Sequence, residues 1–293
     1  AGIFYPPVRV KRQPRQHQPC RDYCTGNYPH GITGRHVPLF YLTMQKFGLI
    51  GFPLTHSFSK KYYDAKMERE QIAGIDYQLY PIPDIGAFPT LLADEPLLMG
   101  VNVTIPYKVA VMDYLDQLAP EASAIGAVNC IRIERPDNGE TFLTGYNTDV
   151  YGFTESLKPL LRPEHRLALV LGNGGAAKAV TYALSQLGIG YSVVSRSATA
   201  SQYSYDQLDA GTMANHLLII NTTPLGTYPA VSGCPDIPYE HIGNTHLLYD
   251  LVYNPEETEF LRRGKVRGAA IKNRLEMLEL QAERNWEIWN TGL

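Results

Sequence analysis

Short apolar runs alternate with amphipathic stretches along most of the chain. Runs rich in β-branched residues predict strands, and apolar residues three or four positions apart predict helices. The expected strands cover 46–53, 76–82, 97–106, 126–134, 141–147, 167–172, 191–196, 216–224, 247–254 and 266–271. The expected helices cover 56–74, 85–94, 107–118, 149–161, 174–188 and 274–290. Strands that alternate with helices indicate an α/β protein with parallel sheets.

The alternation divides into two α/β units. We predict a first domain over residues 44–149 and a second over residues 150–272, with a C-terminal helix at 273–293 that returns to complete the first. A length of 293 residues agrees with two domains of about 150 residues each. Asn138-Gly139, between two expected strands, is a hairpin signal.

Residues 1–43 differ from the rest of the chain in composition. They hold six prolines, four glycines and six basic residues against one acid, Asp22, and they show no apolar period. Their net charge of +5 contrasts with −8 for the remaining residues. Such a segment is unlike a packed domain. We therefore expect residues 1–43 to be a disordered or non-native arm and the functional protein to begin near Met44.

Composition and charge exclude several classes of protein. Hydrophobic residues make up 44% and aromatic residues 11%, which does not fit a disordered chain. No apolar run approaches ~18 residues, so we expect no membrane span. A net charge of −3 gives no basic field for nucleic acid. Four cysteines do not form a disulfide framework, which favours the cytoplasm. We see no cluster of metal ligands.

A glycine-rich loop carries the clearest chemical signal. Residues 172–177 read Gly-Asn-Gly-Gly-Ala-Ala, follow an apolar run and open a helix. Gly172 permits a tight turn, Gly174 lets the backbone approach a pyrophosphate, and Ala177 lets the helix pack closely on the sheet. The helix N-terminus offers N–H groups to phosphates. The loop predicts a dinucleotide site; the alternative is a glycine turn that binds nothing.

The end of the next strand indicates which dinucleotide is bound. An NAD enzyme should show an acid about 20 residues after the loop, to bond the ribose 2′-hydroxyl. This chain has Ser195-Arg196-Ser197 instead, with no acid until Asp206. Arg196 can pair with a 2′-phosphate, which favours NADP. The alternative is a solvated charge at a strand end.

Further motifs place polar groups near the ends of expected strands. Lys108 follows a strand that ends at Pro106, and Asp149 opens a helix. Taken alone, Asp149 would more often be a helix N-cap and Lys108 a surface lysine. The motifs are GFPLTHSFS (51–59), GVNVTIPYK (100–108), IGAVN (125–129), GYNTDVYGF (145–153), GNGGAAKA (172–179), NTTPLG (221–226), YNPEETEFL (253–261) and MLELQA (277–282).

In this order, the motifs resemble those of the shikimate dehydrogenase family, which includes shikimate/quinate dehydrogenases. The resemblance covers residues 44–293. It implies an N-terminal substrate-binding domain and a C-terminal Rossmann NADP-binding domain, with the active site in the cleft between them. It also implies an oxidoreductase of aromatic amino acid and chorismate biosynthesis, which reversibly reduces 3-dehydroshikimate to shikimate with NADPH. We expect a cytoplasmic monomer or homodimer that binds neither nucleic acid nor membrane.

The resemblance assigns roles residue by residue. Lys108 matches the family's catalytic lysine, and Asp149 matches its partner aspartate. The substrate-binding positions are Ser57, Ser59, Thr104, Asn129, Tyr253 and Gln281. The cofactor-binding positions are Gly172, Asn173, Gly174, Gly175, Ala176, Ser195, Arg196, Ser197 and Thr222. No metal is implied. The physical requirement is a positioned donor, because hydride transfer to a ketone builds negative charge on its oxygen.

The chain departs from the family at several positions. Lys60, Tyr63 and Asp64 stand where a Pro and a His-Asn are usual, and Ala200 stands where many members have a second base for NADP. Arg274 replaces a glycine that contacts the nicotinamide. Two alternatives stay open: a dehydrogenase of mixed quinate and shikimate activity and mixed cofactor use, and a non-catalytic NADP-binding regulatory module. The regulatory module would be marked by loss of Lys108 or Asp149. A methylene-tetrahydrofolate dehydrogenase would not explain the serine pair or NTTPLG.

Overall fold

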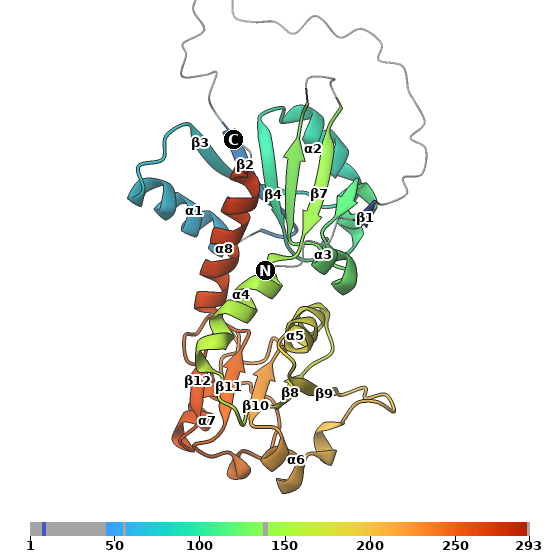
Figure 1. Ribbon diagram of the computed structural model, residues 1–293. Helices are drawn as coiled ribbons and strands as arrows, with labels where there is room; N and C mark the ends of the chain where they lie inside the picture. The colour runs from blue at the N-terminus through green and yellow to red at the C-terminus, as the bar shows by residue number, and fades with distance from the viewer. Residues whose placement is uncertain (1–7, 10–44, 55–56, 137–139, 292–293) are drawn as a thin grey trace, which may run out of the picture. The chain divides into compact units, whose positions relative to one another are not determined.

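The computed structural model describes residues 8–9, 45–54, 57–136 and 140–291. Its chain divides into two compact units, each with its own sheet (Figure 1). The first comprises Ala1–Pro120 with Cys130–Gly145, and the second comprises Glu121–Asn129 with Tyr146–Leu293. Two α/β units confirm the predicted fold class. The boundaries predicted at residues 44, 150 and 273 stay predictions. The predicted arm lies outside the described residues, apart from 8–9.

The first unit is built on a mixed sheet of order β1-β5-β7-β6-β4-β2-β3. The strands are β1 (Val8–Arg9), β2 (Gln45–Gly51), β3 (Ile75–Pro81), β4 (Leu98–Val103), β5 (Gln117–Leu118), β6 (Cys130–Glu134) and β7 (Phe142–Tyr146). β2 pairs in parallel with β3 and β4, but β4 and β6 are antiparallel. The expectation of a parallel sheet is therefore wrong here. Residues 135–141 join the neighbours β6 and β7, too few for the crossover that parallel strands need.

The helices of the first unit are shorter than the sequence pattern predicts. They are α1 (Phe58–Arg69) and α2 (Phe88–Asp94), with single 3₁₀ turns η2 (Ile85–Ala87) and η3 (Ala110–Tyr114). The predicted helix over 107–118 is wrong, because its last residues form β5 and pair with β7. Backbone bonds from Asp116 N to Leu143 O and from Ala119 N to Gly145 O (3.0 and 2.8 Å) hold this segment extended.

The second unit carries a five-stranded sheet of order β12-β11-β10-β8-β9, with all neighbouring strands parallel. Its strands are β8 (Leu167–Leu171), β9 (Gly190–Val194), β10 (Leu218–Asn221), β11 (Leu247–Asp250) and β12 (Ala270–Lys272). The chain order reverses between β8 and β10. In open α/β sheets, ligands bind outside the carboxyl ends of the strands at such a switch point.

The remaining helices are α3 (Pro120–Ile125), α4 (Thr148–Leu157), α5 (Gly175–Gln186), α6 (Ala210–Asn215), α7 (Glu259–Val266) and α8 (Leu275–Asn290), with the 3₁₀ turns η4 (Lys158–Leu160), η5 (Tyr205–Gln207) and η6 (Tyr239–His241). Residues of α4, α5 and α8 pack in one hydrophobic cluster on the second sheet, and residues of α6 and α7 pack in another. Alternate residues of the buried strands face opposite layers: Val170 packs in a cluster with Val180 of α5, and Leu169 in another with Phe260 of α7. The sequence pattern does not predict α3, α6 or α7.

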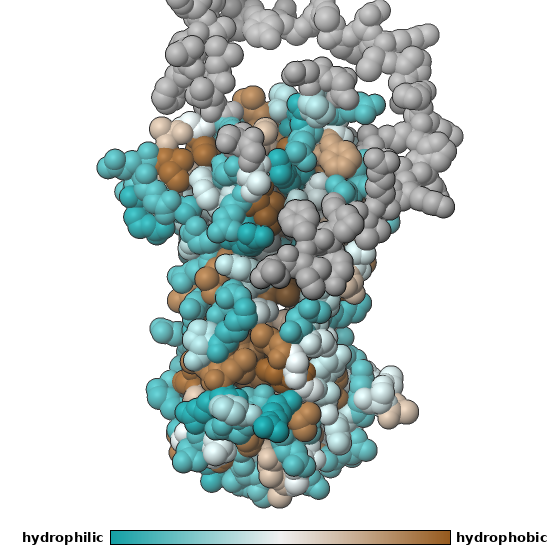
Figure 2. Space-filling model, viewed as in Figure 1, coloured by the Kyte–Doolittle hydropathy of each residue, from teal (hydrophilic) through white to brown (hydrophobic). Residues whose placement is uncertain are grey.

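The surface seen in Figure 2 is mostly hydrophilic, and hydrophobic residues gather on the second unit over β10 and β11. No helix in the described part of the chain has the length and apolar character needed to cross a bilayer. Cys130 is buried and Cys234 is partly buried.

A buried carboxylate joins β10, β11 and α7. Asp250, at the end of β11, is 0% exposed. Its Oδ1 accepts from Asn221 Nδ2 (2.9 Å) and Val252 N (3.0 Å), and its Oδ2 accepts from the hydroxyl of Thr258 (2.5 Å), the N-cap of α7. Burial raises the pKa of Asp250 to about 6, although the three hydrogen bonds oppose this shift.

We predict that Asp250→Asn gains stability relative to the wild type as the pH rises. The raised pKa means that the folded state binds a proton between pH 3.8 and about 6 that the unfolded state has released. The contribution of Asp250 to the free energy of unfolding is therefore greatest below this window and is lost as the pH rises through it. Between pH 5 and 7.5, the difference in free energy of unfolding between Asp250→Asn and the wild type should change by about 1–2 kcal/mol. Urea unfolding at several pH values measures this difference.

Asp209→Asn is the control with the opposite sign. Asp209 caps α6, and its hydrogen bonds with Thr212 lower its pKa. Its contribution is present at neutral pH and is lost as the pH falls. Parallel stability curves for Asp250→Asn and the wild type would contradict the assigned protonation of Asp250.

Candidate active site

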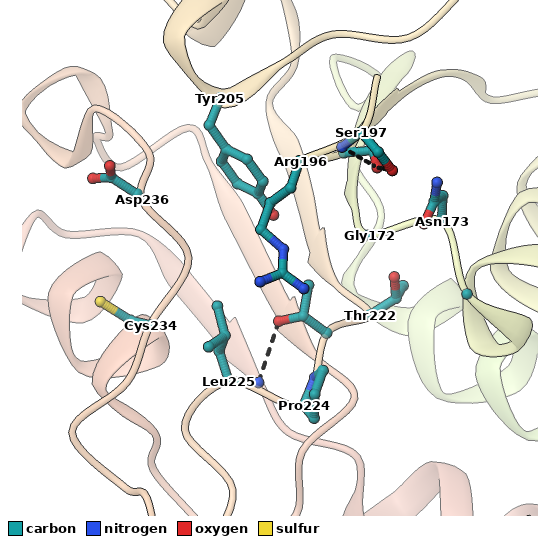
Figure 3. Close-up of a pocket in the computed structure, with 13 residues that line it drawn as sticks. Gly172, Asn173, Arg196, Ser197, Tyr205, Thr222, Pro224, Leu225, Cys234 and Asp236 are labelled. Carbon is teal, nitrogen blue, oxygen red and sulfur yellow. Dashed lines mark hydrogen bonds between the residues drawn. The ribbon is translucent and has the colours of Figure 1, made fainter. Parts of the chain in front are cut away.

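A cavity of about 540 Å³ opens at the switch point of the second sheet. Its walls come from the segments that follow β8, β9 and β10, three neighbouring strands (Figure 3). The lining residues are Gly172, Asn173, Gly174, Ser195, Arg196, Ser197, Tyr205, Thr222, Thr223, Pro224, Leu225, Cys234 and Asp236. All the cofactor positions expected from sequence line it except Gly175 and Ala176, which continue the glycine loop into α5.

The glycine loop has free space around Gly174 and Gly175, where a ligand would approach, but it is closely packed at Gly172. Gly172 has φ +106°, and a Cβ there would lie 2.8 Å from Thr222 Oγ1. Gly174 has φ −77° and caps α5, and a Cβ on Gly174 or Gly175 would meet no atom within 4 Å. The loop therefore presents bare backbone to the cavity at the N-terminus of a twelve-residue helix.

The segment after β9 brings one positive charge to the cavity. Ser195 is buried, and its Oγ accepts a hydrogen bond from Ser197 N (3.3 Å), which shapes a tight turn. Arg196 is exposed, and Figure 3 shows its side chain extending from this turn into the cavity. Burial raises the pKa of the nearby Tyr205 hydroxyl, and the Arg196 charge opposes that shift. The segment after β9 thus presents the Arg196 guanidinium and several hydroxyl groups to the cavity.

The segment after β10 is held by Asn221, which Asp250 orients. Asn221 Oδ1 accepts from Thr223 N (3.0 Å) and from the Thr223 hydroxyl (2.6 Å). Thr222 donates twice to Leu171 O, through its N–H (2.9 Å) and its hydroxyl (2.7 Å). These bonds tie the ends of β10 and β8 together. One wall of the cavity therefore depends on the buried carboxylate behind it.

Part of this lining is not among the residues predicted from the sequence. Thr223, Pro224 and Leu225 belong to the NTTPLG motif and could have been found from it. Tyr205, Cys234 and Asp236 lie far along the chain in segments without a local pattern, and only the folded chain brings them to the cavity.

In the first unit, the predicted positions gather at the ends of the parallel neighbours β2 and β4. Ser57 is the N-cap of α1, and its Oγ accepts from Lys60 N (3.1 Å). Thr104 N donates to Ile50 O (3.0 Å), and Phe52 N donates to Ile105 O (3.2 Å), so the two outgoing segments run together. A Cβ on Gly51 would lie 2.4 Å from Thr104 Cγ2. The glycine lets the two segments approach.

Buried tyrosines contact the segments that carry these predicted positions. The Tyr77 hydroxyl donates to Asn102 Oδ1 (2.8 Å) and interacts with Ser59, and burial raises its pKa well above the usual value. Tyr63 is 1% exposed and stacks on Tyr77, with ring centroids 4.5 Å apart. The departure at Tyr63 is therefore a core contact. Tyr107 anchors the segment that carries Lys108, because its hydroxyl donates to Ile82 O (2.6 Å). Lys108 itself is half-buried.

In the second unit, residues distant in sequence converge beside the N-terminus of α4. Asn129 Oδ1 accepts from Thr148 N (2.7 Å), and Asn129 Nδ2 donates to Gln281 Oε1 (3.1 Å). The Thr148 hydroxyl donates to Asn285 Oδ1 (2.6 Å). Helices α4 and α8 meet at Gly152, where a Cβ would lie 2.4 Å from Met277 O. Two predicted substrate positions, Asn129 and Gln281, are thus in direct contact.

Asp149 lies in the first turn of α4 and is 7% exposed. Its Oδ1 forms an ion pair with Arg274 Nη2 at 3.6 Å. Tyr253 follows β11 and is 38% exposed. Among the residues that the model describes, no group of three or more His, Cys, Asp or Glu side chains is arranged to hold a metal ion.

Comparison with known proteins identifies the relatives of this chain. The family model described as the shikimate dehydrogenase substrate binding domain matches residues 49–131. A shikimate dehydrogenase (NADP(+)) of Clostridium beijerinckii is 40% identical over 257 residues, which cover 84% of this chain and 92% of that protein.

Solved structures agree with these relatives. Shikimate 5-dehydrogenase of Thermus thermophilus, in complex with NADP(H) and shikimate, is 32% identical with a TM-score of 0.73, over 85% of this chain and 94% of that one. A chorismate mutase/shikimate 5-dehydrogenase fusion protein of Clostridium acetobutylicum is 34% identical with a TM-score of 0.72, over 84% and 91%. Identity at this level across both units shows that the chain belongs to the shikimate dehydrogenase family.

Proposed function

We propose that this protein is an NADP-dependent shikimate dehydrogenase, which reversibly reduces 3-dehydroshikimate to shikimate in aromatic biosynthesis. The observation that carries the proposal is the cavity at the switch point, with a bare glycine loop on one side and Arg196 on another. Relatives named for NADP and shikimate support it. Under this proposal, the binding partner of the protein is a small-molecule substrate. A cytoplasmic location and a monomeric or homodimeric state remain part of the proposal.

The residues of the cavity fit a dinucleotide phosphate. Gly174 and Gly175 leave room for a pyrophosphate against the N-terminus of α5, where N–H groups point outward. Arg196, Ser195 and Ser197 would hold the 2′-phosphate by charge-assisted hydrogen bonds. Asn173 and Thr222 complete the wall. When bound, the nicotinamide supplies or accepts the hydride, and the protein supplies position and electrostatics.

The substrate would be held by hydroxyl and amide groups. Ser57 Oγ already accepts from Lys60 N, so its O–H remains a donor for a carboxylate. The N-terminus of α1 adds N–H groups near the same place. Ser59 would be a second carboxylate donor, with Tyr253 as a neighbour. Thr104, Asn129 and Gln281 would bind the hydroxyls and ring edge, and the contact between Asn129 and Gln281 orients both amides.

Lys108 and Asp149 would carry the proton chemistry. Reduction of the ketone builds negative charge on its oxygen, and a nearby ammonium both stabilises that charge and delivers a proton. In this proposal Lys108 Nζ holds the proton that the substrate oxygen takes up. Asp149, which the family resemblance pairs with Lys108, would accept a hydrogen bond from a substrate hydroxyl. In the reverse direction, Lys108 as the neutral amine takes the proton back.

Gly174→Ala should separate cofactor binding from folding. The backbone at Gly174 suits alanine, and the added methyl meets no protein atom, so the melting temperature should change little. The methyl would occupy the space of the pyrophosphate, so we expect a KM for NADP raised by about tenfold or more, which corresponds to ~1.4 kcal/mol. Gly172→Ala is the contrasting variant. Its positive φ and the Thr222 contact should lower the melting temperature. An unchanged KM for NADP in Gly174→Ala would contradict the assignment.

Arg196→Ala should raise the KM for NADP selectively. Loss of a charge-assisted contact costs roughly 1.5–3 kcal/mol, or about 10- to 150-fold in affinity. The KM for NAD should barely change, because NAD lacks the 2′-phosphate. Arg267→Ala, an exposed arginine of the same unit that does not line the cavity, is the control. Equal effects on both cofactors would remove Arg196 from the phosphate site.

Lys108→Ala should lower kcat by about 10²–10⁴-fold, the share of a general acid, while shikimate affinity changes much less. Lys108→Arg should not restore activity, because a guanidinium is a poor proton donor at neutral pH. Asp149→Asn should also lower kcat. Lys61→Ala, an exposed lysine of α1, controls for charge. Single-turnover hydride transfer is the decisive measurement, and wild-type rates in Lys108→Ala would show that the proton comes from elsewhere.

The substrate is tested by four combinations of shikimate or quinate with NADP or NAD. We expect the highest kcat/KM with shikimate and NADP. Activity with quinate alone would replace the proposed substrate. Binding of NADP without turnover of either acid would favour the regulatory module.

A further inference from the structure

The ion pair between Arg274 and Asp149 is largely withdrawn from solvent. The side chains are 25% and 10% exposed, and 3.6 Å separates Nη2 from Oδ1. Arg274 Nε is buried and has no hydrogen-bond partner among the described residues. The two residues are 125 positions apart and lie at the starts of two packed helices, α4 and α8.

The fold does not need a cation at position 274. Arg274 is the N-cap of α8 and makes no capping bond, whereas Asn273 Oδ1 accepts from Leu275 N (3.1 Å). A positive charge at a helix N-terminus opposes the helix dipole. A buried donor without a partner adds a further cost. Glu276 does not offset the charge, because it pairs with Lys272. Local costs of this kind are expected where a residue serves a site.

Backbone contacts place Arg274 at the ligand-binding edge of the sheet. It follows β12, and its N–H donates to Val252 O (3.4 Å). Val252 follows β11, and its own N–H donates to the buried Asp250 (3.0 Å). Arg274 is therefore fixed to the rigid carboxyl edge, and its guanidinium reaches Asp149 from there.

We propose that Arg274 is a positioning residue, which fixes the orientation of the Asp149 carboxylate for the reaction. The inference rests on the proposed function, in which Asp149 partners Lys108. Arg274 acts through Asp149 and has no direct part in proton or hydride transfer. Removing it leaves the carboxylate in more than one orientation, which lowers kcat and leaves the affinity for NADP unchanged.

The test compares Arg274→Met, Arg274→Lys and the control Arg284→Met. Arg284 lies on the same helix and pairs with Glu287 at 2.7 Å, but both side chains are exposed. We expect Arg274→Met to lower kcat about 10- to 100-fold, because a misplacement of a reacting group by about 1 Å can cost about 100-fold in rate. The KM for NADP and the melting temperature should change little. Arg274→Lys should recover part of kcat, and Arg284→Met should match the wild type.

A double-mutant cycle decides whether Arg274 acts through Asp149. In an Asp149→Asn background, Arg274→Met should lower kcat less than about twofold further, because coupled residues are not additive. Losses that multiply would overturn the proposal. So would wild-type kcat in folded Arg274→Met, or a raised KM for NADP with kcat unchanged. If Arg274→Met does not fold, Arg274→Gln takes its place in the cycle.

A crystal structure of Arg274→Met, or of Arg274→Gln in its place, gives a readout independent of turnover. We expect Asp149 to occupy a new rotamer or several. A single rotamer identical to that of the wild type would overturn the proposal even if the protein proved inactive on shikimate. If the wild-type protein does not turn over shikimate but Asp149 is displaced in the Arg274 variant, the proposed function alone is refuted.

Discussion

The buried carboxylate of Asp250 is the interaction on which the cavity at the switch point of the second sheet depends. It collects donors from Asn221, Thr258 and Val252, and Asn221 in turn holds the backbone and hydroxyl of Thr223. The wall after β10 has exposed residues at Pro224 and Leu225, so hydrophobic burial alone does not fix it. A carboxyl group with four acceptor sites can bind three different segments at one point. No apolar side chain at the end of β11 could do this.

The sequence predicts the second unit better than the first, for physical reasons. The glycine loop, its preceding strand and its following helix are local patterns, and each agrees with the parallel sheet around it. Gln117 and Leu118 read as the end of a helix by their spacing, but bonds to β7 hold them in a strand. This strand pairing depends on residues 27 positions further along the chain, and the local sequence shows no strand-like alternation that would predict it. Similarly, α7 follows a charged, proline-containing stretch, and it buries only two large apolar side chains, Phe260 and Leu261, together with Gly264.

Prediction of the site divides in the same way. Gly172, Arg196 and their neighbours could be placed from residue type and position at a strand end. Asn129 and Gln281 could be named only from the family resemblance, because the contact between them depends on the close crossing of α4 and α8 at Gly152. Neither a position at a strand end nor the family resemblance pointed to Tyr205 and Asp236. The departure at Arg274 was visible in the sequence, but its ion pair with Asp149 required the folded chain.

The turn Ser195–Ser197 has an evolutionary consequence. Its residues stand at the end of a strand whose last residue, Val194, is fully buried, while Arg196 and Ser197 are exposed and carry little of the packing. In the proposed function, mutations at these two positions would change which adenosine ribose is accepted and would leave the core intact. The proposed substrate chemistry belongs to other residues and would not change. Under this proposal, cofactor preference could evolve separately from the substrate reaction.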